Sequence, residues 1–352
     1  KKTRSDLEFL SVGGSYLQKL GIKTIYDQKK ITYIAFTDVI FNFFKIKKKI
    51  KQTVTEILKF NPDILFSVDS PDFTLRVSKL VKDKNPKIKT IHFIAPKVWA
   101  WRAGRVKKMK NFLDHILLLF NFEKKYFDKE KLKNTFVGHP LLDKNLKENI
   151  KIDQFLEKKK IISIFPGSRD SEIKHHMPIL INFIKKMNNK DKTFNFVFHS
   201  TNKIKQSISK FILKEKIKNI DVINDDNIKN EVLKKSIFAI VKSGTVSLEV
   251  CRMNIPSIII YKMNLINFYL AKFLLNIKFV NMINIINNKE VIPELLQSEC
   301  NAEEIFKSVN YFLNKPELIS KQKNEIKNTI KNMSSSNSSA MEASKIVLSY
   351  IT

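Results

Sequence analysis

Short apolar runs recur along the chain, and segments with helical spacing separate them. A first series of runs lies at 7–14, 62–70, 89–95, 115–120 and 134–140, and a second lies at 161–165, 194–200, 220–224, 238–245 and 256–262. These runs are apolar on both faces, as are strands of a parallel sheet that helices cover on both sides. The alternation therefore predicts an α/β fold.

A polar, lysine-rich stretch at 144–160 separates the two series. We therefore expect two α/β sheet domains with a cleft between them, the first over 1–155 and the second over 156–330. The remaining residues, 331–352, contain a serine-rich break and then an amphipathic pattern that predicts a helix over 341–351.

The formal net charge is +30, with 64 Lys and Arg against 34 Asp and Glu. Such a charge suits phosphorylated substrates, an anionic membrane or nucleic acid. The lysines are spread along the chain and no nucleic-acid recognition motif is present, so nucleic-acid binding is a remote alternative and we expect no nucleic-acid partner. Only six residues are Arg, and these are the more informative ones, because Lys does not replace a planar, bidentate phosphate contact.

The two cysteines, Cys251 and Cys300, form neither a disulfide framework nor a zinc-binding spacing. A reducing cytoplasm is the default compartment for such a chain. No uncharged apolar run approaches the ~18 residues of a membrane span.

The stretch Phe165–Arg169, "FPGSR", joins the first strand of the second series to a helix. A strand, a glycine turn at Gly167 and a helix start place free backbone N–H groups around one spot, and the helix dipole adds positive potential. Arg169 in the first helical turn is unfavourable unless an anion is nearby. The ATPase P-loop pattern is absent. An anion site that includes Ser168 and a plain structural turn both fit this stretch.

A second loop of the same kind follows the strand that ends at Lys242. Ser243, Gly244 and Thr245 form its turn, and the helix after it carries Glu249. Two such loops at the carboxyl ends of strands in one sheet lie at the edge where open α/β sheets bind ligands, so a diphosphate is a candidate occupant of both. Glu249 is either a hydrogen-bond acceptor for ribose hydroxyls or an ordinary helix glutamate.

The stretch 284–297 carries three polar residues, Asn284, Glu294 and Gln297, in an otherwise apolar frame. Its pattern alone predicts a helix with a proline near its start. No function follows from this stretch by itself.

In the first series, Asp69 and Asp72 flank Pro71 at the end of a strand. Pro71 holds Ser70 away from helical geometry, so Asp69 is presented at the tip of the strand, where catalytic bases are common. The alternative is a carboxylate that caps the following helix, which suits Asp72 better than Asp69.

Both tryptophans of the chain, Trp99 and Trp101, lie just after the next strand, together with Arg102 and Arg105. Such an aromatic and basic cluster suits a phosphorylated or sugar ligand, or it is a half-buried packing hook. His139 lies near the end of the first series and is either a cleft residue or a hydrogen-bonded residue between the domains.

Six segments, in this order and spacing, resemble the lipid-A-disaccharide synthase family. They are "VDSPDF", "IHFIAPKVWAWRAGRV", "FVGHP", "FPGSRDSEI", "SGTVSLE" and "NMINIINNKEVIPELLQSEC". The resemblance spans nearly the whole chain, and "WAWR" together with "PELLQ" is its specific part. It implies two Rossmann-like, doubly wound domains of the glycosyltransferase B type.

The resemblance also implies an activity. Members of the family are inverting glycosyltransferases that move 2,3-diacylglucosamine from UDP-2,3-diacylglucosamine to 2,3-diacylglucosamine 1-phosphate. The products are a β-1,6-linked disaccharide 1-phosphate and UDP, on the route to the lipid A of Gram-negative lipopolysaccharide. The alternative within the same fold is another UDP-sugar enzyme, such as a UDP-N-acetylglucosamine epimerase or a peptidoglycan glycosyltransferase.

The resemblance implies roles for the residues named above. Asp69 would take the proton of the acceptor hydroxyl, and Arg169 would neutralise the leaving diphosphate, so we expect no metal ion and no other cofactor. The implied nucleotide-sugar residues are Gly167, Ser168, Arg169, Ser243, Gly244, Thr245, Glu249, Asn284, Glu294 and Gln297. The candidates on the acceptor side are Asp72, Trp99, Trp101, Arg102 and His139.

The family begins with a strand and a glycine-rich loop that have no counterpart here, so we expect the first strand of the N-terminal domain to be missing. Family members can exchange their C-terminal segment, so the resemblance implies that the helix at 341–351 packs on an N-terminal domain, its own or that of a partner in a swapped homodimer.

Two segments, 31–52 and 261–278, are rich in aromatic and apolar residues and also carry lysines. They suit shallow insertion at an anionic leaflet, or they are core helices with solvated lysines. We expect a cytoplasmic protein that is peripherally attached to the inner face of the inner membrane.

Overall fold

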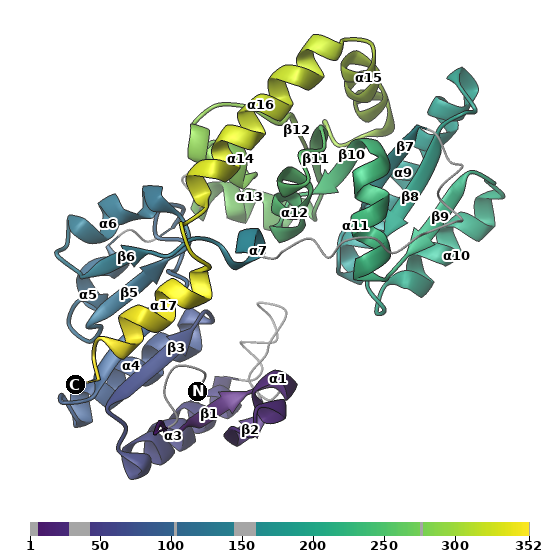
Figure 1. Ribbon diagram of the computed structural model, residues 1–352. Helices are drawn as coiled ribbons and strands as arrows, with labels where there is room; N and C mark the ends of the chain where they lie inside the picture. Colours follow the sequence, from purple (N-terminus) through teal and green to yellow (C-terminus); the bar gives the residue numbers. More distant parts are fainter. Residues whose placement is uncertain (1–5, 28–42, 102–103, 144–159, 275–276, 352) are drawn as a thin grey trace. The chain divides into compact units, whose positions relative to one another are not determined.

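The computed structural model describes residues 6–27, 43–101, 104–143, 160–274 and 277–351 (Figure 1). The chain divides into two compact units. Unit 1 consists of Lys1–Gly138 and Asn337–Thr352, and unit 2 consists of His139–Ser336. Most of the linker expected at 144–160 and the first part of the segment 31–52 lie outside the described residues.

Unit 2 contains a six-stranded sheet in which every neighbouring pair of strands is parallel. Its strands are β7 (Ile161–Phe165), β8 (Asn195–His199), β9 (Ile220–Ile223), β10 (Ser236–Lys242), β11 (Ser257–Tyr261) and β12 (Glu294–Leu296). Their order is β12-β11-β10-β7-β8-β9, so the chain builds outward from β7 in one direction and then from β10 in the other. The strand order therefore reverses between β7 and β10, which makes this pair the topological switch point of the sheet.

The described helices of unit 2 are α7 (Pro140–Asp143), α9 (Asp170–Lys190), α10 (Lys205–Glu215), α11 (Asp226–Lys235), α12 (Thr245–Arg252), α13 (Leu265–Leu274), α14 (Met282–Asn287), α15 (Ala302–Leu313) and α16 (Pro316–Met333). Strand residues such as Ile164 and Ile240 are fully buried, together with Phe183 of α9 and Val309 of α15. Burial of large apolar side chains is the main stabilising contribution to such a unit.

Unit 1 contains a four-stranded parallel sheet in the order β3 (Ile64–Val68), β4 (Lys89–Phe93), β5 (His115–Leu118) and β6 (Asn134–Phe136). Before the C-terminal segment, its described helices are α1 (Ser15–Lys19), α3 (Phe43–Phe60), α4 (Pro71–Lys84), α5 (Arg105–Met109), α6 (Lys124–Asp128) and the short 3₁₀-helix η2 (Asn121–Glu123). β1 (Leu10–Gly13) and β2 (Lys23–Asp27) form a separate two-stranded parallel sheet.

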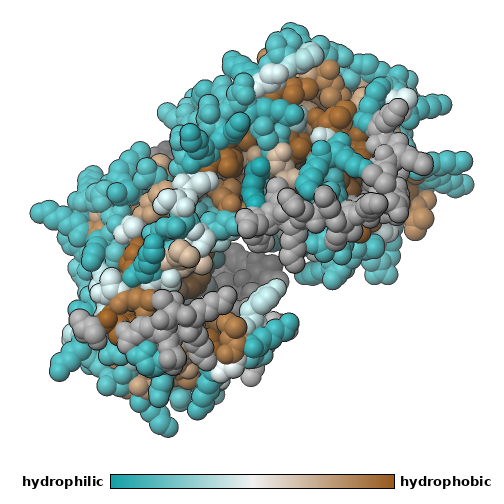
Figure 2. All heavy atoms as spheres, in the orientation of Figure 1, coloured by the Kyte–Doolittle hydropathy of each residue, from teal (hydrophilic) through white to brown (hydrophobic). Residues whose placement is uncertain are grey.

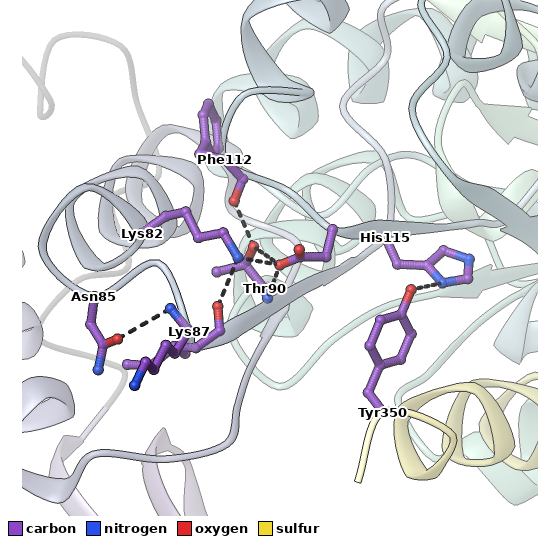
Figure 3. Close-up of polar contacts among 9 residues, drawn as sticks. Lys82, Asn85, Lys87, Thr90, Phe112, His115 and Tyr350 are labelled. Carbon is purple, nitrogen blue, oxygen red and sulfur yellow. Dashed lines mark hydrogen bonds and ion pairs between the residues drawn. The ribbon is translucent and has the colours of Figure 1, made fainter. Parts of the chain in front are cut away.

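The last helix, α17 (Ser339–Leu348), belongs to unit 1 (Figure 1). Its Ala343 is buried among Ile91 and Leu117 of the sheet, and Val347 packs against the same cluster. Just beyond the helix, the Tyr350 hydroxyl lies 3.1 Å from Nδ1 of His115 on β5 (Figure 3). The amphipathic helix predicted near the C-terminus is therefore confirmed, and its apolar face covers the sheet of unit 1.

The alternation of strands and helices predicted from the sequence is confirmed, but the helix predicted across 284–297 is wrong. α14 ends at Asn287, Asn288 adopts a left-handed conformation with φ of 49°, and the chain then forms β12. Pro293 precedes this strand, and an edge strand tolerates a proline because the backbone N–H that proline lacks is not needed there. β2 and β12 are the two described strands that the sequence pattern did not predict.

Hydrophilic residues cover most of the face shown in Figure 2, and smaller apolar areas lie between them. Within the described parts of the chain, no helix has both the length and the apolar character that crossing a bilayer requires.

Candidate functional site

Two loops leave the sheet of unit 2 at its switch point. β7 and β10 are adjacent and parallel, and Phe165 at the end of β7 pairs with Val241 near the end of β10. The loop that contains Arg169 and the loop that contains Ser243 therefore lie at the same edge of the sheet, as the sequence predicted. Open α/β sheets bind ligands in the crevice at this position.

Gly167 gives the first loop its shape. Its φ is +131°, which L residues rarely adopt, and a Cβ atom built there would lie 2.6 Å from Oε2 of Glu172 and 2.7 Å from its Cβ. Only glycine allows the backbone to turn at this point and the Glu172 carboxylate to approach it.

Glu172 is a residue of this site that the sequence analysis missed. Its side chain is buried on the first turn of α9, and Oε2 accepts hydrogen bonds from the backbone N–H groups of Ser168 (2.8 Å) and Arg169 (3.3 Å). The expectation of free N–H groups in this loop is therefore wrong for these two, because an internal carboxylate occupies them. The sequence does contain the signal, since a glutamate three residues after a helix N-cap commonly reaches back in this way.

Lys242 connects the two loops. Its Nζ lies 3.0 Å from Oε1 of Glu172 and 5.0 Å from the centroid of the Tyr261 ring. Burial alone raises the pKa of Glu172, but the hydrogen bond from the Ser168 N–H and the contacts with Lys242 outweigh burial and lower it. Glu172 is therefore ionised and holds the loop after β7 against the end of β10.

His176 connects the first loop to a third segment. Its ring is fully buried, Nδ1 lies 2.6 Å from the carbonyl oxygen of Pro166, and Nε2 accepts the backbone N–H of Lys262 at 3.0 Å. Burial lowers the pKa of His176, which favours the neutral ring that this arrangement of one donor and one acceptor requires. The loop after β7 is thereby fixed to the end of β11.

Asn284 and Glu294 support the edge of the site from inside. Asn284 is fully buried, and its amide accepts the N–H groups of Val291 and Ile292 and donates to Glu294 at 2.8 Å. Glu294 accepts the N–H groups at 280 and 281, and burial raises its pKa. Their contacts are therefore with the protein itself, and they hold the chain between α13 and β12 in place.

Gln297 has a similar position. Its side chain is buried, Oε1 accepts the Met263 N–H at 2.8 Å, and Nε2 donates to the Met263 carbonyl at 3.2 Å. Gln297 thus fixes the segment that follows β11, close to the residue that His176 holds.

The second loop presents Gly244 and Thr245 to solvent at the start of α12. The hydroxyl of Ser243 donates to the carbonyl oxygen of Val280 at 3.0 Å, so it joins the loop to the segment that Glu294 holds. Glu249 lies one turn further on and forms an ion pair of 2.7 Å with Lys229 of α11.

Arg169 is exposed at the start of α9, and no ion pair of its guanidinium group occurs among the residues that the structure describes. Its charge is close enough to act on the ionisation of Glu172 and Tyr261. Two cations, Arg169 and Lys242, thus lie near one internal carboxylate. The loops at the switch point therefore have an excess of positive charge, which suits a phosphorylated ligand.

In unit 1, Asp69 directly follows β3 and is exposed. Asp69 and Ser70 have φ values of 50° and 48°, so two successive residues adopt the left-handed conformation. This costs about 1–2 kcal/mol for each L residue, less for Asp. The backbone is nevertheless held, since the Asp69 N–H donates to Phe93 on β4 and the Thr74 hydroxyl donates to the Asp69 carbonyl at 2.7 Å. Strain that the surrounding structure maintains in this way is common at functional sites.

Asp72 lies in the first turn of α4, whose N-cap is Ser70, so the expectation that Asp72 caps this helix is wrong; its carboxylate lies 3.2 Å from the guanidinium of Arg105. The Trp99 indole N–H donates to Glu123 at 3.2 Å, and its ring packs edge-on against Phe122, as the packing-hook interpretation expects. Burial raises the pKa of Glu123 to about 7.

Trp101 is 40% exposed, and Arg102 lies outside the described residues. His139 is buried in unit 2, and its Nδ1 accepts the Leu141 N–H at 3.2 Å. Among the described residues no group of three or more His, Cys, Asp or Glu side chains is arranged to hold a metal ion.

Sequence relatives identify the family of this chain. A family model described as lipid-A-disaccharide synthetase matches residues 1–347. Lipid-A-disaccharide synthase from Rickettsia bellii is 34% identical over 330 residues, which cover 91% of this chain and 85% of that protein. The enzyme of the same name from Persephonella marina is 33% identical over 336 residues, which cover 92% of this chain and 88% of that protein.

Solved structures share the fold at low sequence identity. A putative UDP-N-acetylglucosamine 2-epimerase from Listeria monocytogenes has a TM-score of 0.60 and 13% identity, covering 94% of this chain and 83% of that one. The UDP-GlcNAc 2-epimerase from Neisseria meningitidis bound to UDP-GlcNAc has a TM-score of 0.58 and 15% identity, covering 90% of this chain and 85% of that one. A glycosyltransferase from Rickettsia africae has a TM-score of 0.55 and 16% identity, covering 97% of this chain and 88% of that one.

Proposed function

The chain belongs to the lipid-A-disaccharide synthase family, and on that premise we propose that it joins two acylated glucosamine units. It transfers 2,3-diacylglucosamine from UDP to the 6-hydroxyl of 2,3-diacylglucosamine 1-phosphate. The observation that carries this proposal is the pair of loops at the switch point of unit 2, where Arg169 and Lys242 suit a diphosphate. The structurally similar epimerase from Neisseria meningitidis is bound to UDP-GlcNAc, which supports a nucleotide-sugar as the ligand of this chain.

In this proposal the reaction is a single inverting displacement. The acceptor oxygen forms a bond to the anomeric carbon from the face opposite UDP, and the bond from that carbon to the diphosphate breaks. Asp69 takes the proton of the acceptor hydroxyl, and the electron pair of the broken bond leaves on UDP, where Arg169 stabilises the negative charge. The transition state has oxocarbenium character, by analogy with glycoside hydrolysis.

The remaining site residues of unit 2 form two groups, one accessible to a ligand and one buried. Gly167, Ser168, Gly244 and Thr245 form the accessible surface of the two loops and are proposed to contact the diphosphate. Glu249 is proposed to accept the ribose hydroxyls.

Asn284, Glu294 and Gln297 are proposed to serve the nucleotide-sugar by holding the surrounding loops, because their described hydrogen bonds are internal. On the acceptor side, Trp101 offers an exposed ring. We also propose acceptor-side roles for Asp72, Trp99, Arg102 and His139.

The test of this function is UDP release with purified protein. We expect UDP and a disaccharide 1-phosphate from UDP-2,3-diacylglucosamine together with 2,3-diacylglucosamine 1-phosphate, and at least about 10²-fold less turnover with UDP-N-acetylglucosamine, which lacks the binding energy of the acyl chains. The fold is shared with epimerases, so the second measurement is the appearance of the 2-epimer of UDP-N-acetylglucosamine without an acceptor. Epimer formation and no disaccharide would contradict the proposal.

We further propose that the protein attaches peripherally to the inner face of the inner membrane. Leu265, Tyr269 and Phe273 on α13 are 64%, 64% and 88% exposed and lie four residues apart, so they form one apolar stripe along the helix. Exposed aromatic side chains beside lysines, such as Lys272 on the same helix, suit shallow insertion into an anionic leaflet.

Flotation with vesicles that contain about one-quarter anionic lipid tests the stripe. We expect the unaltered protein to float at low salt and a Tyr269→Ser/Phe273→Ser variant to lose most of this binding, because the apolar area that enters the leaflet is gone. The matched control is Tyr311→Ser, which removes a 53% exposed aromatic ring from α15. Equal flotation of all three proteins would argue against α13 as the contact.

A homodimer that exchanges α17 also stays a proposal. In this chain α17 packs on unit 1 after the break at 334–338, and an exchanged helix would make the same contacts with a second copy. Light scattering across a concentration series measures the mass of the particle in solution and tests this proposal. A mass that stays that of the monomer would exclude the exchange.

A further inference from the structure

Lys242 has so far contributed only to the general positive charge of the two loops, without an assigned contact with the substrate, yet it connects the two loops through Glu172. Resting on the proposed function, we propose that Lys242 is a second cation for the diphosphate of the UDP-sugar, and that Glu172 is the residue that positions its ammonium group.

The position of Lys242 is fixed by the sheet. It is the last residue of β10 and pairs in register with Ile260 of β11, so its side chain starts at the carboxyl edge of the sheet. The side chain is 18% exposed, and Nζ lies 3.0 Å from Oε1 of Glu172. Because the backbone and the ammonium are both held, Lys242 loses little further freedom when it binds a ligand, which favours affinity.

Gly244 leaves Lys242 accessible from the second loop. A Cβ atom at Gly244 would lie 3.7 Å from Nζ, so the ammonium is next to the backbone of the loop that begins α12. On its other side, Nζ lies 5.0 Å from the centre of the Tyr261 ring. The ammonium thus faces the turn that the diphosphate is proposed to contact.

Glu172 removes two backbone donors from the first loop, which favours a second cation for the diphosphate. Its carboxylate already occupies the N–H groups of Ser168 and Arg169, so these donors do not serve a phosphate in this arrangement. At the first loop, the negative charge of the diphosphate must therefore be met by side chains. A lysine ammonium has three N–H donors, and the one contact with Glu172 leaves others for the phosphate.

A series of three ligands tests the role of Lys242. Uridine, UMP and UDP share a nucleoside and differ in the number of phosphates, and their dissociation constants are measured by calorimetry. We expect Lys242→Met to weaken UDP binding about 10- to 100-fold, the size of one charge-assisted hydrogen bond, and to change uridine binding less than about threefold. Lys242→Arg should recover part of the UDP affinity because it keeps the charge.

The control is Lys327→Met, which removes one positive charge from an exposed position of α16 and should leave all three constants unchanged. An equal loss for uridine and UDP would mean that Lys242 only shapes the site, and unchanged UDP binding would remove it from the site. Either result overturns the inference. If the unaltered protein binds no UDP, the proposed function fails instead.

The positioning role of Glu172 has its own readout in the same experiment. Glu172→Gln keeps the size of the side chain and removes the charge that holds Lys242. We expect its effect on UDP affinity to be smaller in the Lys242→Met background than in the unaltered protein, because two residues that act through one contact are not additive. Equal effects in both backgrounds would show that Glu172 does not act through Lys242.

Discussion

Replacing Asp69 with Asn lowers kcat for disaccharide formation about 10²- to 10⁴-fold, the usual contribution of a positioned general base. The amide has nearly the size of the carboxylate but does not take up the proton of the acceptor hydroxyl. The left-handed φ of 50° at Asp69 is no obstacle, since Asn is among the residues that tolerate this conformation best. The substitution therefore removes the base and leaves the backbone at the tip of β3 intact.

The binding of UDP serves as the internal control for this variant. Asp69 belongs to unit 1, whereas the two loops proposed for UDP belong to unit 2, so the dissociation constant for UDP should not change. The matched substitution is Asp63→Asn, which removes an exposed carboxylate just before β3, at the opposite end of that strand, and should change kcat less than about threefold, as surface charges usually do. Near-normal turnover of Asp69→Asn would show that another group is the base.

The two sheets were predictable because the amino-acid composition of their strands identifies them. β7, β10 and β11 are apolar on both faces. When such strands alternate with helices, few folds other than a parallel sheet with helices on both faces bury them. Because β7 and β10 are neighbours in a parallel sheet, the loops that follow them lie at the same edge of the sheet. β12 was not predictable in this way, because three residues at an edge, preceded by Pro293, contain too few positions to set a period.

The chemistry of the site was only partly predictable, because hydrogen bonds between distant segments decide which groups are free. The sequence identified the loop around Gly167 as rich in N–H donors, but Glu172 satisfies two of them. Likewise, Asn284 reads as a polar residue without a partner, whereas folding places it among the N–H groups of Val291 and Ile292. Buried polar groups are nearly always satisfied, so a polar residue in an apolar frame does not by itself indicate a ligand site.

Replacing Arg169 with Ala lowers kcat about 10²- to 10³-fold, the loss found when a preorganised group that stabilises developing charge is removed. Arg169 is exposed at the start of α9, and no ion pair within the described chain holds its guanidinium, so the group is available to the leaving UDP. The charge on the diphosphate increases as the bond to the sugar breaks. The contact therefore strengthens toward the transition state, and the loss is expected in kcat more than in KM.

Arg169 and Lys242 differ in the structure, and the difference separates their effects. Lys242 is ion-paired with Glu172 before any ligand binds, so it contributes mainly to the affinity for UDP, whereas Arg169 has no ion pair among the described residues and contributes to bond breaking. Arg169→Lys should restore only part of kcat, because an ammonium does not make the bidentate contact of a guanidinium. Arg76→Ala, at an exposed position of α4, is the matched control and should leave kcat unchanged. A variant at Arg169 that loses UDP affinity but keeps kcat would assign the leaving-group role to another cation, with Lys242 the first to examine.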